Sequence, residues 1–372
     1  MTKNTENPFL ALTAPGISAL QPYIPGKPVS ELERELGISN SIKLASNEHP
    51  QGPSARVKEA IEAQLADLAR YPDGSGFTLH NKLAQHHGVA AEVITLGNGS
   101  NDVLDLVART FLYPGVEAVF SQYAFAIYPI STQAAGATAR VAAAKDYGHD
   151  LEAMRALVGE KTRVVFIANP NNPTGTWLRS GELKSFIASL PQTVMVVVDE
   201  AYIEYVQEPD YPDASQWLGE FPNLIVTRTF SKAYGLAGLR IGYGLSHSAV
   251  ADLLNRVRHP FNVNSLALAA AEAALEDQEH IRESVKMNAE GMARLSAGFD
   301  ALGLSYIPSV GNFITVDVGQ PAGSVDQALL REGCIARPVA NYGLPNHLRV
   351  TVGLPEENEY LLAALARVLG RE

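Results

Sequence analysis

Short apolar runs recur through the middle of the chain, each about the length of one strand. Helix-sized segments separate them, and the runs lack the polar alternation that is typical of a half-exposed strand. Strands covered on both faces have this pattern, so it predicts a mostly parallel sheet between layers of helices. The predicted strands are Ala118–Phe120, Val164–Ala168, Val194–Val198 and Leu224–Thr227.

Apolar residues at helical spacing predict helices around these strands. Residues 54–69 form one such helix, with Ser54 as its N-cap. A second helix is predicted directly after the Gly-rich segment Gly97–Asn101. A long amphipathic stretch runs from about residue 265 past residue 300, where the chain leaves the first sheet.

The two ends of the chain differ from its middle. The first 50 residues are rich in Pro, Gly, Ser and Asn and predict an extended arm with one helix at about Val29–Leu36. The tail predicts three strands and a closing helix, at Phe313–Val318, Cys334–Arg337, Leu348–Val352 and Glu356–Leu369. We therefore expect an arm over residues 1–45, a large α/β domain over 46–265 and a small α+β domain over 266–372.

Composition excludes several classes of protein. The single cysteine among 372 residues excludes a disulfide framework and a cysteine-cluster zinc site. No apolar run reaches the length of about 18 residues that a membrane span needs. The net charge of −11 disfavours nonspecific binding to nucleic acids or anionic membranes. Residues 1–15 lack the apolar core of a signal peptide, so we expect a cytoplasmic protein.

Polar segments follow three of the predicted strands, at the edge where ligands bind in open α/β sheets. They are Asn169–Gly175, Asp199–Tyr202 and Arg228–Lys232. Gly97–Asn101 precedes a helix, whose free N–H groups and dipole suit an anion, although the segment is neither a full dinucleotide-binding fingerprint nor a Walker loop. The sequence thus offers an amide, a carboxylate, a lysine and an anion cup at one edge of a sheet.

Each of these features alone is more often structural. Asp199 by itself would be an N-cap or a salt-bridge partner, and Lys232 a solvated surface lysine. Lys232, however, follows a buried strand and is flanked by hydroxyl and small side chains. Such a lysine can be desolvated, which lowers the pKa of its amine and makes it a nucleophile. Together the four features match what pyridoxal phosphate requires: a Schiff-base lysine, an acid for the ring nitrogen, donors for the ring hydroxyl and a phosphate cup.

The ordered set resembles the fold-type I pyridoxal-phosphate aminotransferases and, among them, the histidinol-phosphate aminotransferases. The resemblance implies their α/β fold, in which helices sandwich a mostly parallel sheet of a seven-stranded type and a smaller α+β domain follows. The matching motifs span nearly the whole chain. They are KLASNEHP (43–50), RYPDGSG (70–76), LGNGSND (96–102), QYAFAIYP (122–129), NPNNPTG (169–175), DEAYIEY (199–205), TFSKAYGLAGLRIGYG (229–244), FNVNSLA (261–267), ARPVANYGLPNHLRVTVG (336–353) and PEEN (355–358). One departure is His49, where the family usually has asparagine; we assign it no mechanistic role.

The resemblance implies roles for the cofactor-binding residues. Lys232 would form the Schiff base and then move a proton between the substrate Cα and the cofactor. Asp199 would pair with the ring nitrogen, and Tyr123 would stack on the ring. The ring hydroxyl would be bound by Asn172 and Tyr202. The phosphate would be bound by Ser100, Asn101, Thr229, Ser231 and Arg240. Tyr71 matches a family tyrosine that reaches the phosphate of the neighbouring subunit, which implies a homodimer.

The resemblance also implies substrate contacts. Arg349 occupies the position of an arginine that clamps the substrate α-carboxylate, a bidentate pair that gives both energy and orientation. Its structural alternative is a salt bridge within the small domain. Tyr23, on the arm, and Arg337 resemble contacts to the phosphate of the substrate, and Asn47 belongs to the same substrate-binding group.

The function that the resemblance implies is transfer of an amino group from histidinol phosphate to 2-oxoglutarate, giving imidazole-acetol phosphate and glutamate in histidine biosynthesis. Two alternatives keep the cofactor: an aminotransferase for phenylalanine or tyrosine, and a decarboxylase of a phosphorylated amino acid. A DNA-binding regulator is disfavoured, because only about 40 residues precede residue 43 and the charge is negative. The motifs of a zinc protease and of a serine hydrolase are absent from the sequence.

Overall fold

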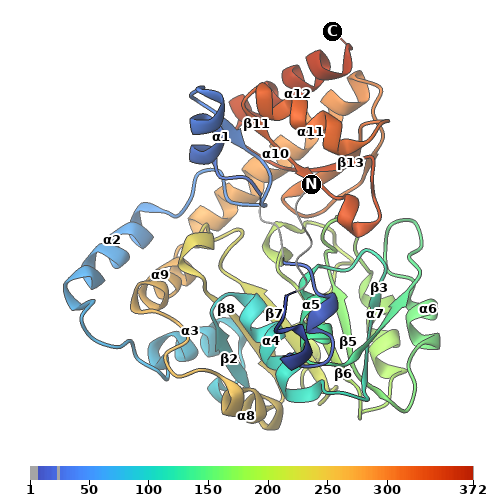
Figure 1. Ribbon diagram of the computed structural model, residues 1–372. Coiled ribbons are helices and arrows are strands. Elements are labelled where there is room, and N and C mark those ends of the chain that lie inside the picture. Colours follow the sequence, from blue (N-terminus) through green and yellow to red (C-terminus); the bar gives the residue numbers. More distant parts are fainter. Residues whose placement is uncertain (1–6, 23–25, 372) are drawn as a thin grey trace.

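A seven-stranded sheet lies at the centre of the large domain of the computed structural model, which describes residues 7–22 and 26–371 (Figure 1). The strand order is β2-β8-β7-β6-β5-β3-β4, and only β8 is antiparallel to its neighbours. The mostly parallel sheet predicted from the sequence is therefore confirmed. Its strands are β2 (Ile94–Gly97), β3 (Glu117–Ser121), β4 (Thr138–Ala142), β5 (Thr162–Ala168), β6 (Met195–Asp199), β7 (Leu224–Thr229) and β8 (Gly242–Ser246).

Helices cover both faces of this sheet. Alternate residues of β6 enter two different hydrophobic clusters: Val196 and Val198 join one, and Val197 joins the other. Because successive side chains of a strand point to opposite faces, this explains why β6 reads as a continuous apolar run. One face is packed by α2 (Ala55–Gln64), α3 (Phe77–His87), α6 (Leu151–Ala156), α7 (Ser180–Ala188) and α9 (Ser265–Glu276); the other by α4 (Ser100–Phe111), α5 (Ile127–Ala134) and α8 (Ser248–Val257).

The small domain is built on a four-stranded antiparallel sheet of order β12-β13-β10-β9. Residues 26–45 of the N-terminal arm belong to this half of the molecule, because strand β1 pairs with β11 and Leu32 of α1 packs against Leu330 and Ile335. The earlier part of the arm lies on the large domain instead, where Gly16 sits against Gln133 of α5. Figure 1 shows α1 beside the C-terminal elements. The elements are α1 (Val29–Leu36), β1 (Ile42–Lys43), α10 (Gln278–Ala301), β9 (Tyr306–Ile307), β10 (Phe313–Asp317), α11 (Ala322–Arg331), β11 (Cys334–Ile335), β12 (Arg337–Pro338), β13 (His347–Thr351) and α12 (Pro355–Leu369).

One predicted strand is wrong, and the predicted amphipathic stretch divides into two helices. The run Cys334–Arg337 is not one strand, since β11 pairs with β1 whereas β12 pairs with β13 in the other sheet. The long stretch after residue 265 is two helices, which break at Asp277. The Asp277 carboxylate caps α10 by accepting a hydrogen bond from the His280 N–H at 3.3 Å.

The position of α9 bears on the domain boundary. Ala267 and Leu268 of α9 are buried in the cluster of the large domain, together with residues of α2 and α3. Leu295 and Phe299, in the C-terminal half of α10, are buried in the cluster of the small domain. We infer that the large domain extends through α9 to about residue 276, and that α10 leads from one domain into the other.

Candidate active site

A cavity of about 360 Å³ lies at the carboxyl ends of β5, β6 and β7. This is the edge at which parallel α/β sheets bind ligands. The cavity brings together residues that are as much as 303 positions apart in the chain, Ser46 and Arg349. The sequence-predicted residues that line it are Asn47, Ser100, Asn101, Asn172, Asp199, Tyr202, Thr229, Ser231, Lys232, Arg240 and Arg349.

Lys232 lies in the loop that follows β7 and projects into this cavity. Its Nζ donates a hydrogen bond to the Ser46 carbonyl at 3.2 Å and lies 5.6 Å from the centre of the Tyr202 ring. Burial, with help from the positive charges of Arg349 and Arg240, lowers the pKa of Lys232 to about 7. A large share of the amine is therefore neutral, and nucleophilic, near neutral pH.

Asp199 is the last residue of β6 and its carboxylate is buried. Thr227, its register partner on β7, donates to Oδ1 at 2.9 Å, and the Tyr128 hydroxyl donates to Oδ2 at 2.9 Å. Burial raises the pKa of Asp199, while these two hydrogen bonds and Lys232 oppose the rise. Tyr128 was not among the sequence-predicted residues; the only signal for it is the second tyrosine of QYAFAIYP.

An anion cradle forms where α4 begins. The first N–H groups of a helix have no intrahelical acceptor and point out of its N-terminus. Gly99 has a φ of +82°, and a Cβ there would lie 2.4 Å from Nη2 of Arg240, so a larger residue would displace the guanidinium. Nη1 of Arg240 in turn donates to the Ser231 hydroxyl at 3.4 Å. Ser231 lies two residues after Thr229, whose hydroxyl belongs to the same predicted group. Hydroxyls, a guanidinium and a helix N-terminus thus converge on one side of the cavity.

A network of side-chain hydrogen bonds lies on the opposite side of the cavity. Tyr202 accepts hydrogen bonds from the side-chain amides of Asn47 at 2.9 Å and Asn172 at 3.2 Å. Because its oxygen already accepts two bonds, the Tyr202 O–H is left to donate elsewhere. Nη1 of Arg349 donates to Oδ1 of Asn172 at 2.6 Å, and Nη2 donates to the Ala45 carbonyl at 2.8 Å. Arg349 is therefore fixed in position within the described structure.

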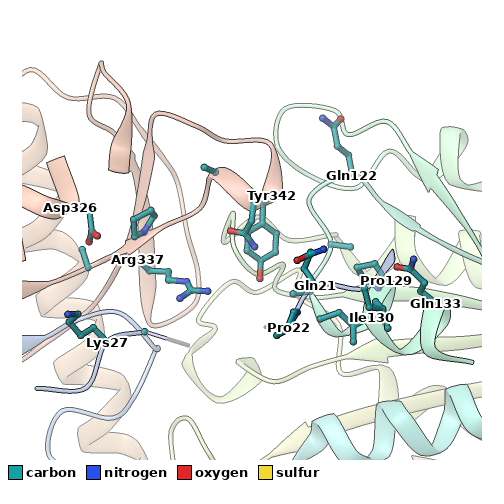
Figure 2. A pocket seen from close by; sticks show the side chains of 18 of the residues that line it. Gln21, Pro22, Lys27, Gln122, Pro129, Ile130, Gln133, Asp326, Arg337 and Tyr342 are labelled. Carbon is teal, nitrogen blue, oxygen red and sulfur yellow. The ribbon is translucent and has the colours of Figure 1, made fainter. Parts of the chain in front are cut away.

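Arg337 lies opposite Arg349 across the β12–β13 pair, so both side chains leave the same face of the sheet. Arg337 lines a second cavity of about 830 Å³, which meets the first one at Tyr342. Figure 2 shows this second cavity, with Arg337 and Asp326 on one wall and Gln21 and Ile130, from the arm and α5, across from them. The two arginines therefore serve adjoining spaces rather than one.

Two other predicted residues, Tyr123 and Tyr71, do not line the first cavity in this chain. The ring of Tyr123 packs near Tyr147, with centroids 6.0 Å apart, and Phe125 lines the cavity instead. Tyr71 is 82% exposed and stacks on Phe261 at 4.7 Å. Tyr23 lies outside the described residues.

His49, the residue that departs from the usual family motif, is buried two positions after Asn47. Ser284 donates to the His280 carbonyl at 2.6 Å, so its oxygen accepts from His49 Nε2 at 2.7 Å. Nδ1 of His49 accepts from the Gln51 N–H at 3.2 Å. These contacts require a neutral imidazole, and burial lowers the pKa of His49 to about 4. His49 thus ties the loop that carries Asn47 to α10.

The depressed pKa of His49 predicts a loss of stability in acid. The unfolded chain takes up a proton below about pH 6.5, whereas the folded chain does so only near pH 4. Stability should therefore fall as the pH drops from 7 to 5, by about 2 kcal/mol from this residue alone. In urea unfolding at both pH values, His49→Asn should lose less stability than the wild type. His259→Asn, at an exposed site, should match the wild type; an unchanged pH dependence in His49→Asn would contradict the assignment.

Comparison with known proteins places this geometry in a family. Residues 39–365 match the family of class I and II aminotransferases. The chain belongs to the class I and II aminotransferases. The aminotransferase is 61% identical to histidinol-phosphate aminotransferase 2 of Pseudomonas aeruginosa, over 98% of this chain and 99% of that protein. It is 59% identical to histidinol-phosphate aminotransferase 2 of Methylococcus capsulatus, over 96% of this chain and 98% of the relative.

A solved structure supports the same assignment. Histidinol-phosphate aminotransferase from Sinorhizobium meliloti, in complex with pyridoxal 5′-phosphate, superposes on the aminotransferase with a TM-score of 0.88. The two are 31% identical, over 96% of this chain and 97% of the other. Within the described residues of the aminotransferase, no group of three or more histidine, cysteine or acidic side chains could hold a metal ion.

Proposed function

We propose that this chain is a pyridoxal-phosphate-dependent aminotransferase of histidine biosynthesis, which moves an amino group between histidinol phosphate and 2-oxoglutarate. The observation that carries the proposal is the placement of Lys232, Asp199 and the Arg240 cradle in one small cavity. The names of its relatives and the cofactor in the Sinorhizobium meliloti structure support it.

The residues of the cavity fit pyridoxal phosphate in chemistry and arrangement. The space kept open by Gly99, beside Arg240 and the start of α4, suits a phosphate. The buried carboxylate of Asp199 suits a protonated ring nitrogen, because burial without a cation is costly for a carboxylate. The Tyr202 O–H and the Asn172 amide suit the ring hydroxyl. Lys232 is left as the amine for the aldehyde carbon.

When bound, pyridoxal phosphate supplies an electron sink for the charge that develops at the substrate Cα. The protein supplies the proton transfer. Burial lowers the pKa of Lys232 to about 7, close to the working pH, which suits an amine that must take a proton from the substrate Cα and then pass it on to the cofactor. Asp199 keeps a negative charge opposite the ring nitrogen, and the arginines hold the anionic group of the substrate.

The two arginines account for two different substrates. Arg349 lies in the first cavity and can hold the carboxylate of glutamate or 2-oxoglutarate. Arg337 lies in the adjoining cavity and can hold a second anion, such as the phosphate of histidinol phosphate. The two substrates would bind one after the other, so the kinetics would be ping-pong.

We also propose a homodimer in the cytoplasm. Tyr71 and Phe261 are exposed and stack on the outside of the subunit, with exposed Leu65, Leu68 and Phe77 on neighbouring segments. A second copy would cover this apolar surface, and Tyr71 would then reach the phosphate cradle of the neighbouring subunit. None of the helices in residues 7–22 and 26–371 is long and apolar enough to span a membrane.

A panel of amino donors tests the proposed substrate. With 2-oxoglutarate as acceptor, kcat/KM should be higher for histidinol phosphate than for phenylalanine or tyrosine. Arg337→Met should lower kcat/KM for histidinol phosphate by about tenfold or more, because a charged hydrogen bond is lost, and should spare phenylalanine. A clear preference of the wild type for the aromatic amino acids would assign the chain to the aromatic aminotransferases instead.

A further inference from the structure

The Tyr128 hydroxyl reaches the Asp199 carboxylate from α5, a helix that packs against one face of the sheet. Tyr128 belongs to α5 and is 1% exposed. Its hydroxyl donates to Oδ2 of Asp199 at 2.9 Å, while Thr227 donates to Oδ1 at the same distance. Each carboxylate oxygen therefore has its own hydroxyl donor, and the two donors come from different elements.

The Tyr128 ring is held firmly in this orientation. It stacks on Phe166 of β5, with centroids 4.8 Å apart and planes at 10°, and meets the edge of Phe125 at 5.9 Å. Both contacts are favoured aromatic geometries. Phe125 itself lines the candidate cavity, so the same cluster connects the wall of the cavity to the hydroxyl behind it. The hydroxyl thus has little freedom to leave Asp199.

We propose that Tyr128 is a positioning residue, which orients the Asp199 carboxylate toward the ring nitrogen of pyridoxal phosphate and keeps it ionised. The proposal rests on the proposed function, because it requires that nitrogen to lie against Asp199. Tyr128 touches neither substrate nor cofactor in this arrangement; it acts through Asp199. A hydrogen-bond donor behind a group that contacts a cofactor fixes the orientation and the basicity of that group.

The electrostatics around Asp199 explain why a donor is needed there. The ionisable groups facing it are Tyr128 from α5, Tyr202 from the segment after β6, and Lys232 from the loop after β7. Burial raises the pKa of Asp199, and the Tyr128 hydrogen bond opposes that rise. Burial beside Asp199 also holds the pKa of Tyr128 well above its usual value, so its hydroxyl stays protonated and remains a donor. Removing the hydroxyl should leave Asp199 easier to protonate.

Tyr128→Phe tests the proposal in the full-length holoenzyme. The variant should fall about ten- to a hundredfold in kcat near neutral pH, with little change in KM, because a hydrogen bond to a charged group is lost. The loss should shrink as the pH rises, since Asp199 is then ionised again. When the apoprotein is titrated with pyridoxal phosphate and followed by absorbance, the dissociation constant of the variant should be larger than that of the wild type. Thr227→Val removes the other donor without touching the aromatic cluster, and it should likewise lower kcat and raise the dissociation constant.

Tyr243→Phe is the matched control. Tyr243 is equally buried, and its hydroxyl pairs with His87 at 2.9 Å, away from Asp199. This variant should keep the pH profile and cofactor affinity of the wild type. If Tyr128→Phe and Thr227→Val both behave like Tyr243→Phe, the positioning role is overturned. If the wild type itself does not bind pyridoxal phosphate, the proposed function fails instead, so the two failures are distinguishable.

Discussion

Replacing Lys232 by alanine should remove nearly all aminotransferase activity, with kcat reduced by at least about 10⁴-fold. The side chain is proposed to act twice, as the amine that attaches the cofactor and as the base at the substrate Cα. Among the described residues that line the cavity there is no second amine that could take over, because the other cationic groups are the guanidinium groups of Arg240 and Arg349. Guanidinium groups stay protonated and are not nucleophiles at neutral pH. Steady-state assays with histidinol phosphate and 2-oxoglutarate measure the loss.

The control for this variant is Lys58→Ala, at an exposed position on α2, which should keep full activity. Lys232→Ala should remain folded, since the Nζ makes one hydrogen bond, to the Ser46 carbonyl. It should still bind pyridoxal phosphate weakly through the cradle. Activity within tenfold of the wild type would show that another group carries out the proton transfer.

Replacing Asp199 by asparagine should reduce kcat by about 10²–10³-fold, the range found when one preorganised electrostatic group is removed. Asparagine has nearly the shape of aspartate. Its Oδ1 can accept from one of the two hydroxyls of Thr227 and Tyr128, and the other hydroxyl can turn to accept from its amide N–H. It carries no negative charge, however, and cannot keep a ring nitrogen protonated. The expected effect is therefore on kcat rather than on folding or on KM for the amino donor.

The absorbance spectra of Asp199→Asn and wild type, each loaded with pyridoxal phosphate, show whether the cofactor responds to the charge of Asp199, because the variant removes the charge and nearly keeps the shape. The spectrum of the variant should change while its thermal stability stays close to that of the wild type. Asp252→Asn, an exposed residue of α8, should change neither. If Asp199→Asn retains the kcat of the wild type, then Asp199 does not act on the cofactor ring.

Much of the site was predictable because buried parallel strands have a strong local signal. Asp199 and Lys232 come at or after the ends of strands whose sequences are continuous apolar runs. In a parallel sheet the carboxyl ends of neighbouring strands lie at one edge, so the two residues are brought together. The cradle at Gly99 was predictable as an anion site from its place before an apolar helical pattern, because the free N–H groups and dipole at the start of a helix suit an anion. These predictions needed only the local sequence and the sheet rule.

Features that depend on tertiary contacts were not predictable in this way. β4 was missed because four of its five residues are exposed at the sheet edge, so no apolar run marks it. β11 and β12 were merged because the chain changes sheets within four residues, which a run of apolar letters cannot show. α9 packs with the large domain through Ala267 and its neighbours, small residues that give no hint of their partner.

Tyr128 illustrates the same limit within the site. Its motif contains two tyrosines, and the sequence gives no reason to prefer one for contact with the site. The orientation of α5 on β5 decides the matter: it turns Tyr128 inward, onto Phe166 and Asp199, while Tyr123 lies near Tyr147. Which residue of a helix faces a buried carboxylate follows from packing, and the packing appears only in the folded chain.

Borohydride reduction tests most directly whether Lys232 holds pyridoxal phosphate in this cavity. The holoenzyme is reduced with borohydride, which fixes the cofactor to the amine that carries it, and the labelled peptide is mapped. A single adduct on Lys232, with loss of the absorbance band of the cofactor, is the predicted result. An adduct on any other lysine, or no adduct in protein that has taken up pyridoxal phosphate, would contradict the claim.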